Sequence, residues 1–452
     1  AGRDGGPPLR FRFAVIRRRK HTNMHNGEAR RLAARVGLVL CMISLSGAAC
    51  TDSSSDSGAD HFGDVTFTGE PVKVGVAAPI DTPVGTYPQI FSSVQAAARA
   101  INTNGGLNGH KLEIVTCNTQ ADPNQEAACG RKMASEGVIA VVGSLVVSNV
   151  SGFEAALTEH DIADLGANAL QPASYQGTNT FPIDFPSAAY AACTNPDMLE
   201  AAGADSVALV AENTTPSRAS ADAIAEAAEN QGTTVASETF PNPGVSDYSP
   251  YVENASDGDP GLAVLALGPT SQAGFVTAAA GVGKDWAYCS RDTAMAPASI
   301  KQLGAAASKY FIGATFPPPS ASDRYPGIED YVDQMKVQEE SGDEYASLEM
   351  DTYNPAGMRA WLGMQALKSV VEGIQDEVTS STFLNMLRNS QSVDVAGVIG
   401  PIDFTAPIGT GDYPRVYNDI EVGVQWNVDE GEFNLLESVK FHGVPALLGG
   451  GS

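Results

Sequence analysis

Apolar and polar positions along the chain follow two patterns, one typical of strands and one typical of helices. Together they predict a repeated strand–helix arrangement. A short β-branched run at residues 73–77 predicts a buried strand. Apolar residues at 89–102 recur at steps of three and four, which places them on one face of a helix. After a glycine-rich turn, residues 111–117 return to a strand pattern. This unit is βαβ, so its two strands are expected to be parallel with a right-handed crossover.

The same alternation continues along the chain. It predicts a helix from Asp122 to Glu136, a strand at 137–143, a helix beginning near Ser148 or Asn149, and a strand at 162–165. An extended, proline-containing segment at 181–186 then interrupts the pattern, and a second stiff segment follows at 313–319. Between them the pattern predicts helices at 193–202, 217–230 and 271–281, and strands at 206–210, 233–240 and 262–267. The sequence therefore predicts an α/β protein with two doubly wound, parallel-sheet lobes.

Four segments in a fixed order carry a resemblance to a known family. They are VKVGVAAPI from Val72, AINTNGGLNGHKLEIV from Ala100, DPNQEA from Asp122 and GVIAVVGS from Gly137. Their order and spacing resemble the leucine/isoleucine/valine-binding proteins, which are type I periplasmic binding proteins that serve ABC transporters. The likeness runs from about Val72 to about Glu437 and is strongest in its first hundred residues.

The resemblance implies a domain plan with a three-segment hinge. Helices at 328–339, 355–373 and 382–388 would return to the first lobe, residues 398–404 would form the third crossing, and strands at 422–428 and 434–439 would end the second lobe. The expected plan has an upstream extension and signal peptide at 1–49, a flexible tether at 50–70, and a tail at 441–452. Lobe 1 would comprise 71–187 plus 316–398, and lobe 2 would comprise 188–315 plus 399–440.

The charge is strongly acidic but unevenly distributed. The formal charge is −26 over 452 residues, whereas residues 1–49 hold ten Lys and Arg against two Asp and Glu. An acidic body repels nucleic acid and anionic membrane surfaces, so neither is an expected partner.

The basic start predicts an export signal. Three arginines precede an apolar run at 36–45, and small residues at 46–49 lead to Cys50. This arrangement resembles a bacterial lipoprotein whose Cys50 is cleaved and acylated, although Gly47 stands where that pattern usually has leucine. Ordinary signal cleavage with a free Cys50 is the alternative. The signal can begin at Met24, in which case residues 1–23 would be a misassigned start.

Four cysteines in the body predict two disulfides in an exported protein. Cys117 and Cys129 close a loop of twelve residues, and Cys193 and Cys289 are then left to pair. Buried free thiols are the alternative. No spacing typical of a zinc site occurs, so neither a metal nor a cofactor is expected.

The candidate chemistry is binding. No nucleophile elbow, phosphate loop or metalloprotease motif occurs, which argues against an enzyme. The loops after the strands at 137–143 and 162–165 should lie at one sheet edge, where open α/β sheets bind ligands. The start of the helix near Ser148 can hold an anion through its backbone N–H groups, or it can be a plain helix cap.

The resemblance implies particular contacts. Tyr87 would cover a ligand, and Asp292 would face a ligand ammonium. The family's carboxylate-binding position corresponds to Val147, and Ser148 lies next to it. Ala167 to Ala169 match a loop that offers N–H groups to the carboxylate. The full set of expected ligand-binding residues is Tyr87, Ser144, Ser148, Ala167, Asn168, Ala169, Ser217, Thr270 and Asp292.

These features together predict an extracytoplasmic solute receptor of an ABC importer, lipid-anchored at the outer face of the cytoplasmic membrane. It would close two lobes on a small polar solute, such as an amino acid or another carboxylated metabolite. Its partners would be the permease and ATPase subunits. The alternative is a ligand-sensing receptor domain of the same fold that acts through a separate signalling partner.

Overall fold

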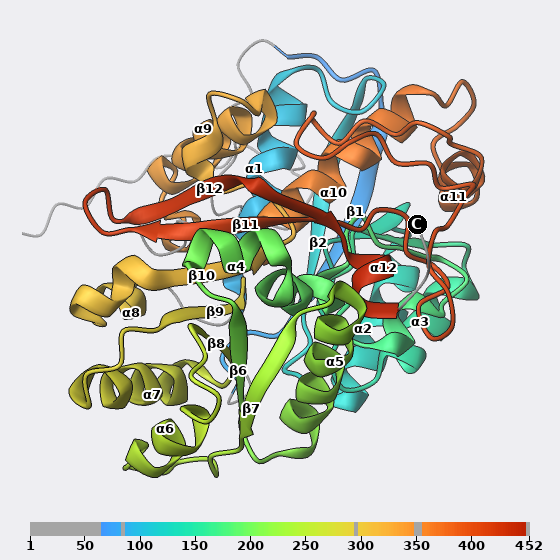
Figure 1. Cartoon of the computed structure of the whole chain (residues 1–452). Coiled ribbons are helices and arrows are strands. Elements are labelled where there is room, and N and C mark those ends of the chain that lie inside the picture. The colour runs from blue at the N-terminus through green and yellow to red at the C-terminus, as the bar shows by residue number, and fades with distance from the viewer. Residues whose placement is uncertain (1–64, 83–85, 293–296, 348–354, 449–452) are drawn as a thin grey trace, which may run out of the picture. The chain divides into compact units, whose positions relative to one another are not determined.

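The computed structural model describes residues 65–82, 86–292, 297–347 and 355–448 (Figure 1). The predicted signal peptide, Cys50 and most of the predicted tether lie outside the described residues. Within the described part, no helix is long and apolar enough to cross a membrane.

The first sheet has five strands in the order β2-β1-β3-β4-β5, and all of its strand pairs are parallel. The strands are β1 (Gly69–Ala78), β2 (His110–Asn118), β3 (Ala140–Val142), β4 (Ala163–Leu165) and β5 (Thr180–Phe181). The helices grouped with it are α1 (Pro88–Thr103), α2 (Pro123–Glu136), α3 (Val150–Thr158), α9 (Pro326–Glu340), α10 (Pro355–Glu372) and α11 (Ser380–Arg388). The sheet, α1 and α10 share one large apolar core.

The second sheet has seven strands in the order β12-β11-β10-β9-β8-β6-β7. They are β6 (Ser206–Ala211), β7 (Thr234–Thr239), β8 (Leu262–Ala266), β9 (Ala287–Arg291), β10 (Tyr310–Ala314), β11 (Ile420–Asn427) and β12 (Glu432–His442). Its helices are α4 (Pro196–Ala202), α5 (Thr215–Gln231), α6 (Ser249–Ala255), α7 (Pro269–Gly281), α8 (Pro297–Lys301) and α12 (Gly443–Leu448). Strands β6 to β10 pair in parallel, whereas β11 and β12 form the long antiparallel pair beside β10 (Figure 1).

The predicted fold class, an α/β protein with two parallel-sheet lobes, is confirmed. The chain passes between the two sheets three times, after β5, after β10 and before β11. The start of α2 shows why the prediction held locally. The Asp122 carboxylate accepts hydrogen bonds from the N–H groups of Asn124 and Gln125, and Pro123 occupies the first turn, where its missing N–H costs nothing.

Two predicted segments differ from the structure near the first crossing. Residues 193–202 are not one helix, because a 3₁₀ segment at Pro186–Thr194 ends before Asn195, which caps α4. Pro196 enforces this break, since the residue before a proline disfavours helical backbone. The segment at 181–186 also contributes Phe181 to the two-residue edge strand β5.

The third crossing lies later than the predicted residues 398–404. Val398, Ile399, Ile402 and Phe404 are buried in the same core cluster as β1 and α10, and the second sheet resumes only at Ile420. The apolar side chains of this segment therefore hold it in the first lobe.

The predicted tail at 441–452 is wrong for its first eight residues. Strand β12 extends to His442, and α12 follows at Gly443–Leu448. Helix α12 packs against α5, and its Ala446 and Leu447 are buried. Burial of these apolar residues explains why the segment packs against the second lobe.

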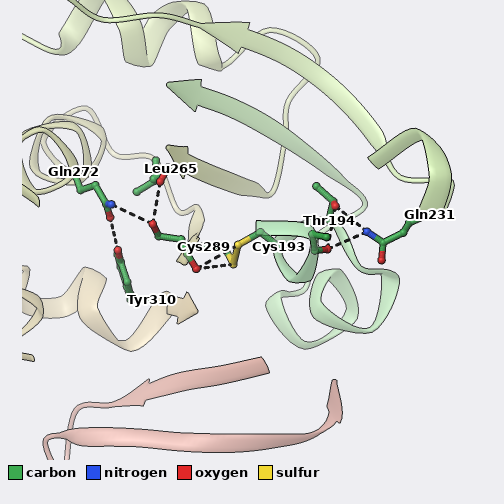
Figure 2. The surroundings of a disulfide bond; sticks show 9 residues. Cys193, Thr194, Gln231, Leu265, Gln272, Cys289 and Tyr310 are labelled. Carbon is green, nitrogen blue, oxygen red and sulfur yellow. Dashed lines mark hydrogen bonds between the residues drawn. A yellow bond between two sulfur atoms is a disulfide. The ribbon is translucent and has the colours of Figure 1, made fainter. Parts of the chain in front are cut away.

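Both predicted disulfides are present. Cys117 at the end of β2 pairs with Cys129 in α2, and Cys193 pairs with Cys289 in β9. Figure 2 shows the second bond between the segment before α4 and the sheet. Next to it, Gln272 donates to the hydroxyl of Ser290, which in turn donates to the Leu265 carbonyl oxygen. The Cys193–Cys289 bond therefore joins two segments that are 96 residues apart, and it lies beside the buried hydrogen bonds of Ser290.

Candidate functional site

Two loops at the carboxyl ends of neighbouring strands form the candidate site. One follows β3 and contains Ser144; the other follows β4 and contains Asn168. The Asn168 N–H donates to the Ser144 carbonyl oxygen at 2.7 Å, which ties the loops together. Gly143, just before Ser144, permits a close approach of α10, because it has a φ of +64° and a Cβ there would lie 2.4 Å from Ala360 Cβ. Ser144, Ala167, Asn168 and Ala169 are all buried, so the structure brings four of the predicted residues together.

The side-chain amide of Asn168 is an unsatisfied polar group. The residue is only 4% exposed, and neither Nδ2 nor Oδ1 has a hydrogen-bond partner within the described part of the chain. A buried amide without partners costs stability, and native proteins rarely leave one unpaired without a reason. The amide offers both a donor and an acceptor to an incoming molecule.

An anion does occupy the start of α3, but it belongs to the chain itself. The Glu126 carboxylate accepts hydrogen bonds from the backbone N–H groups of Val147 at 2.9 Å and Ser148 at 2.9 Å and 3.0 Å, and also from that of Asn149. We call these three N–H groups the amide nest. Glu126 lies in the first turn of α2 and is fully buried.

Two other predicted contacts of the first lobe have hydrogen-bond partners outside the Asn168 loop. Ser148 is exposed, and its hydroxyl donates to the Ala121 carbonyl oxygen at 2.7 Å. Tyr87 is half-buried, packs against the core of the first lobe, and donates its N–H to the Pro79 carbonyl oxygen at 2.9 Å. Among the described contacts, none joins either residue to Asn168.

Two predicted contacts of the second lobe lie at helix starts. Ser217 is in the first turn of α5, where its hydroxyl accepts a hydrogen bond from Thr214 at 3.1 Å. Thr270 is exposed at the start of α7. It lines an open hollow of about 650 Å³ with residues 244–248 and other residues of α7.

Asp292 belongs to a buried charge cluster that the sequence did not predict. Arg359 of α10 binds both carboxylate oxygens of Asp184, with Nε at 2.9 Å and 2.8 Å, and its Nη2 reaches the Thr315 hydroxyl at 3.3 Å. Asp292 accepts from the N–H and hydroxyl of the same Thr315, both at 3.3 Å. Glu421 of β11 is also part of this cluster and is fully buried.

The electrostatics of the cluster are dominated by burial. Burial raises the pKa of Asp292, and the positive charges of Arg359 and Arg291 oppose the rise. Burial also raises the pKa of Glu421 well above its usual range, and the negative charges of Asp292 and Asp184 raise it further. Asp184 lies in the first crossing, Thr315 in the second and Glu421 just after the third. Arg359 therefore bonds to the first two crossings, and its charge acts on Glu421 beside the third.

A second buried acidic pair lies beneath the candidate loops. The Ser144 hydroxyl donates to Asp164 Oδ2 at 2.6 Å, and the Asp164 carboxyl interacts electrostatically with that of Glu154 in α3. Glu154 Oε2 and Asp164 Oδ1 have no hydrogen-bond partner in the described part, so two buried carboxyls interact without a donor to neutralise them. Burial raises the pKa of Asp164 to about 6 and that of Glu154 well above its usual range.

The stability of Asp164→Asn relative to the wild type should rise with pH. The native state holds the carboxyl proton up to about pH 6, whereas the ordinary pKa is 3.8, so this contribution to stability is lost as pH rises through that window. We expect the free energy of unfolding of Asp164→Asn, relative to the wild type, to increase by about 3 kcal/mol between pH 4 and 7.

Urea denaturation at a series of pH values measures this difference. The control is Asp205→Asn, which removes an exposed carboxylate and should track the wild type at every pH. A constant difference between Asp164→Asn and the wild type from pH 4 to 7 would contradict a raised pKa of the buried Asp164.

Comparisons with known proteins agree with this geometry. The family model described as periplasmic binding protein matches residues 71–414. The Leu/Ile/Val-binding protein of Escherichia coli (strain K12) is 36% identical over 81 residues, which are 18% of this chain and 22% of that protein. The matched part thus spans about a fifth of the curated relative.

Solved structures share the fold at low identity. A leucine-binding protein from Thermotoga maritima has a TM-score of 0.60 and 17% identity, with 81% of this chain and 97% of that chain covered. A solute-binding protein of an ABC transporter from Rhodopseudomonas palustris, in complex with p-hydroxybenzoic acid, has a TM-score of 0.61 and 15% identity, with 83% and 98% covered. Members of this family are exported solute-binding proteins and not enzymes. The chain therefore belongs to the periplasmic binding protein family, and the predicted resemblance to its type I, leucine/isoleucine/valine-binding members is confirmed.

Proposed function

We propose that this protein is the solute receptor of an ABC importer and that it closes two lobes on a small polar solute. The observation that carries the proposal is the buried, unpartnered amide of Asn168, which lies at the carboxyl ends of β3 and β4. Ligands of open α/β sheets bind at such strand ends. A bound solute would supply the hydrogen bonds that Asn168 lacks.

The charge cluster around Arg359 supports a hinge role for the three crossings. The arginine contacts Asp184 and Thr315 directly, while Asp292 and Glu421 lie near it. The segments of a hinge must keep a defined position relative to one another while the lobes move. A buried charge network can fix that position. Tyr87, Ser217, Thr270 and Asp292 remain proposed contacts of the closed form.

The finer parts of the proposal concern partners and anchoring. The permease and ATPase of an importer are the proposed partners, and acylated Cys50 is the proposed anchor on the outer face of the cytoplasmic membrane. Intact-mass analysis of the membrane fraction would find a terminal Cys50 with acyl chains. A sensory receptor domain of the same fold is the alternative; neighbouring permease and ATPase genes favour transport, whereas a neighbouring histidine kinase gene favours sensing.

A thermal-shift screen of small metabolites tests solute binding, because a ligand of the native state raises its melting temperature. For a solute found in this way, Asn168→Leu should lower the affinity by about tenfold or more, since it removes both polar atoms at similar volume. The same substitution should leave the stability of the free protein equal or higher, because it removes an unsatisfied amide.

Asn124→Leu is the matched control, since Asn124 is exposed in the first turn of α2. Calorimetric titration of the wild type and both variants gives the affinities. Equal affinity of Asn168→Leu and the wild type would remove Asn168 from the binding site.

A further inference from the structure

We infer that Glu126 is an internal anion that fills the amide nest, so that this receptor takes an uncharged polar group at Asn168 and does not anchor a solute carboxylate at residues 147–149. The uncharged group is of the carboxamide, urea or hydroxyl class. This inference names a solute class and therefore rests on the proposed function.

The nest has no capacity left for a second anion. Its three N–H groups all point to the two oxygens of one carboxylate, and Ser148 donates to both of them. The nest lies directly before α3, whose partial positive charge at its start favours a single anion. A solute carboxylate there would meet the buried charge of Glu126 without water to screen it, and like charges at short range repel.

Other polar groups of the loop pair are also occupied. The Ser144 hydroxyl donates to Asp164, and the Ser144 carbonyl oxygen accepts the Asn168 N–H. The Ser148 hydroxyl donates to the Ala121 carbonyl oxygen. In this loop pair, both polar atoms of the Asn168 side chain lack a hydrogen-bond partner in the described structure.

The chemistry of this amide selects the solute group. A carboxylate only accepts hydrogen bonds, so it would satisfy Asn168 Nδ2 and leave Oδ1 without a donor. A carboxamide, a urea or a hydroxyl group both donates and accepts, so it can satisfy both atoms. An uncharged group also carries a smaller desolvation cost in a buried site than an ion.

Removal of the Glu126 side chain provides a test that does not depend on knowing the solute. Glu126→Ala should lower the melting temperature by about 5 °C, because three N–H groups lose their buried acceptor. Sodium acetate should then refill the nest and raise the melting temperature of the variant by about 2 °C or more at about 100 mM. The wild type should show no such shift.

Sodium chloride at equal ionic strength separates binding from a general salt effect. Glu159→Ala is the control variant, because Glu159 is an exposed glutamate just after α3. If Glu126→Ala does not fold in buffer alone, the recovery of folded protein on refolding with acetate, compared with chloride, gives the same readout. Equal responses of Glu126→Ala and the wild type to acetate would overturn the internal-anion assignment.

Matched solute pairs test the specificity directly. The pairs are 4-hydroxybenzamide with 4-hydroxybenzoate and L-leucinamide with L-leucine. The wild type should bind the amide of a pair at least about tenfold more tightly than the carboxylate, a difference typical of a buried polar mismatch. Tighter binding of the carboxylate would overturn the specificity assignment while leaving the receptor function intact. Acetate rescue of Glu126→Ala together with no solute binding in a broad screen would instead reject the receptor function and keep the internal anion.

Discussion

Replacing Arg359 with methionine is expected to lower the free energy of unfolding by about 3–5 kcal/mol at pH 7, as removal of one partner from a buried ion pair does. The Arg359 side chain is 1% exposed and that of Asp184 is fully buried. The variant leaves Asp184, Asp292 and Glu421 buried without their shared cation. Because Asp292 and Glu421 already have raised pKa values, the loss of unfolding free energy in the variant should become smaller as pH falls and these acids become neutral.

Lys368→Met in the same helix is the matched control. Lys368 pairs with Glu372 at 3.1 Å on the exposed face of α10, and such surface pairs contribute about 1 kcal/mol or less. Guanidinium denaturation of both variants compares the two losses. Similar small losses for both variants would contradict a structural role for the charge cluster that links the three crossings.

Loss of the Cys193–Cys289 disulfide is expected to destabilise the protein more than loss of Cys117–Cys129. Cys193 and Cys289 are 96 residues apart in the sequence, whereas Cys117 and Cys129 are 12 residues apart. Restriction of the unfolded chain grows with loop length, so we expect losses of about 4–5 kcal/mol and about 3 kcal/mol respectively. Ser290 directly follows Cys289 and is hydrogen-bonded to Gln272 and to the Leu265 carbonyl oxygen, so loss of the Cys193–Cys289 bond would also loosen these contacts. Cys289, Gln272 and Leu265 are labelled in Figure 2.

Double alanine variants of each pair allow this comparison without a reductant. Guanidinium denaturation of both variants and the wild type gives the two losses. A larger loss for Cys117→Ala/Cys129→Ala than for Cys193→Ala/Cys289→Ala would contradict the loop-length explanation.

The sequence predicts much of the fold because its signals are local. Asp122 and Pro123 mark the start of α2, and the period of apolar residues marks α1. Strand β9 was missed, although it is central in the second sheet, because its five residues include tyrosine, serine and arginine and have no clear period. The position of residues 398–404 was missed because only tertiary packing assigns their side chains to the first lobe.

The site was harder to predict because its key contacts are long-range. Arg359 and Asp184 are 175 residues apart, and each alone reads as an ordinary charged residue. The sequence left open whether the start of α3 holds an anion or is a plain helix cap, and the structure shows both, since Asn149 also caps the helix. Glu126 could not be identified as that anion, because a glutamate in the first turn of α2 is already explained by the helix dipole.

Asn168 shows how the hydrogen bonds of a predicted residue can differ from the expected ones. The resemblance implied that its loop offers backbone N–H groups to a carboxylate. In the structure the Asn168 N–H is bonded to Ser144, and the side-chain amide is the group without a partner. The difference between a carboxylate site and an amide site therefore depends on hydrogen bonds that no sequence pattern records.

The most direct test is a crystal structure of the wild-type protein with a solute identified by the thermal-shift screen. The account predicts an uncharged solute group within hydrogen-bond distance of both Asn168 Nδ2 and Oδ1, with Glu126 still bonded to the N–H groups of Val147, Ser148 and Asn149. A solute carboxylate bound to those three N–H groups, with Glu126 displaced, would contradict it.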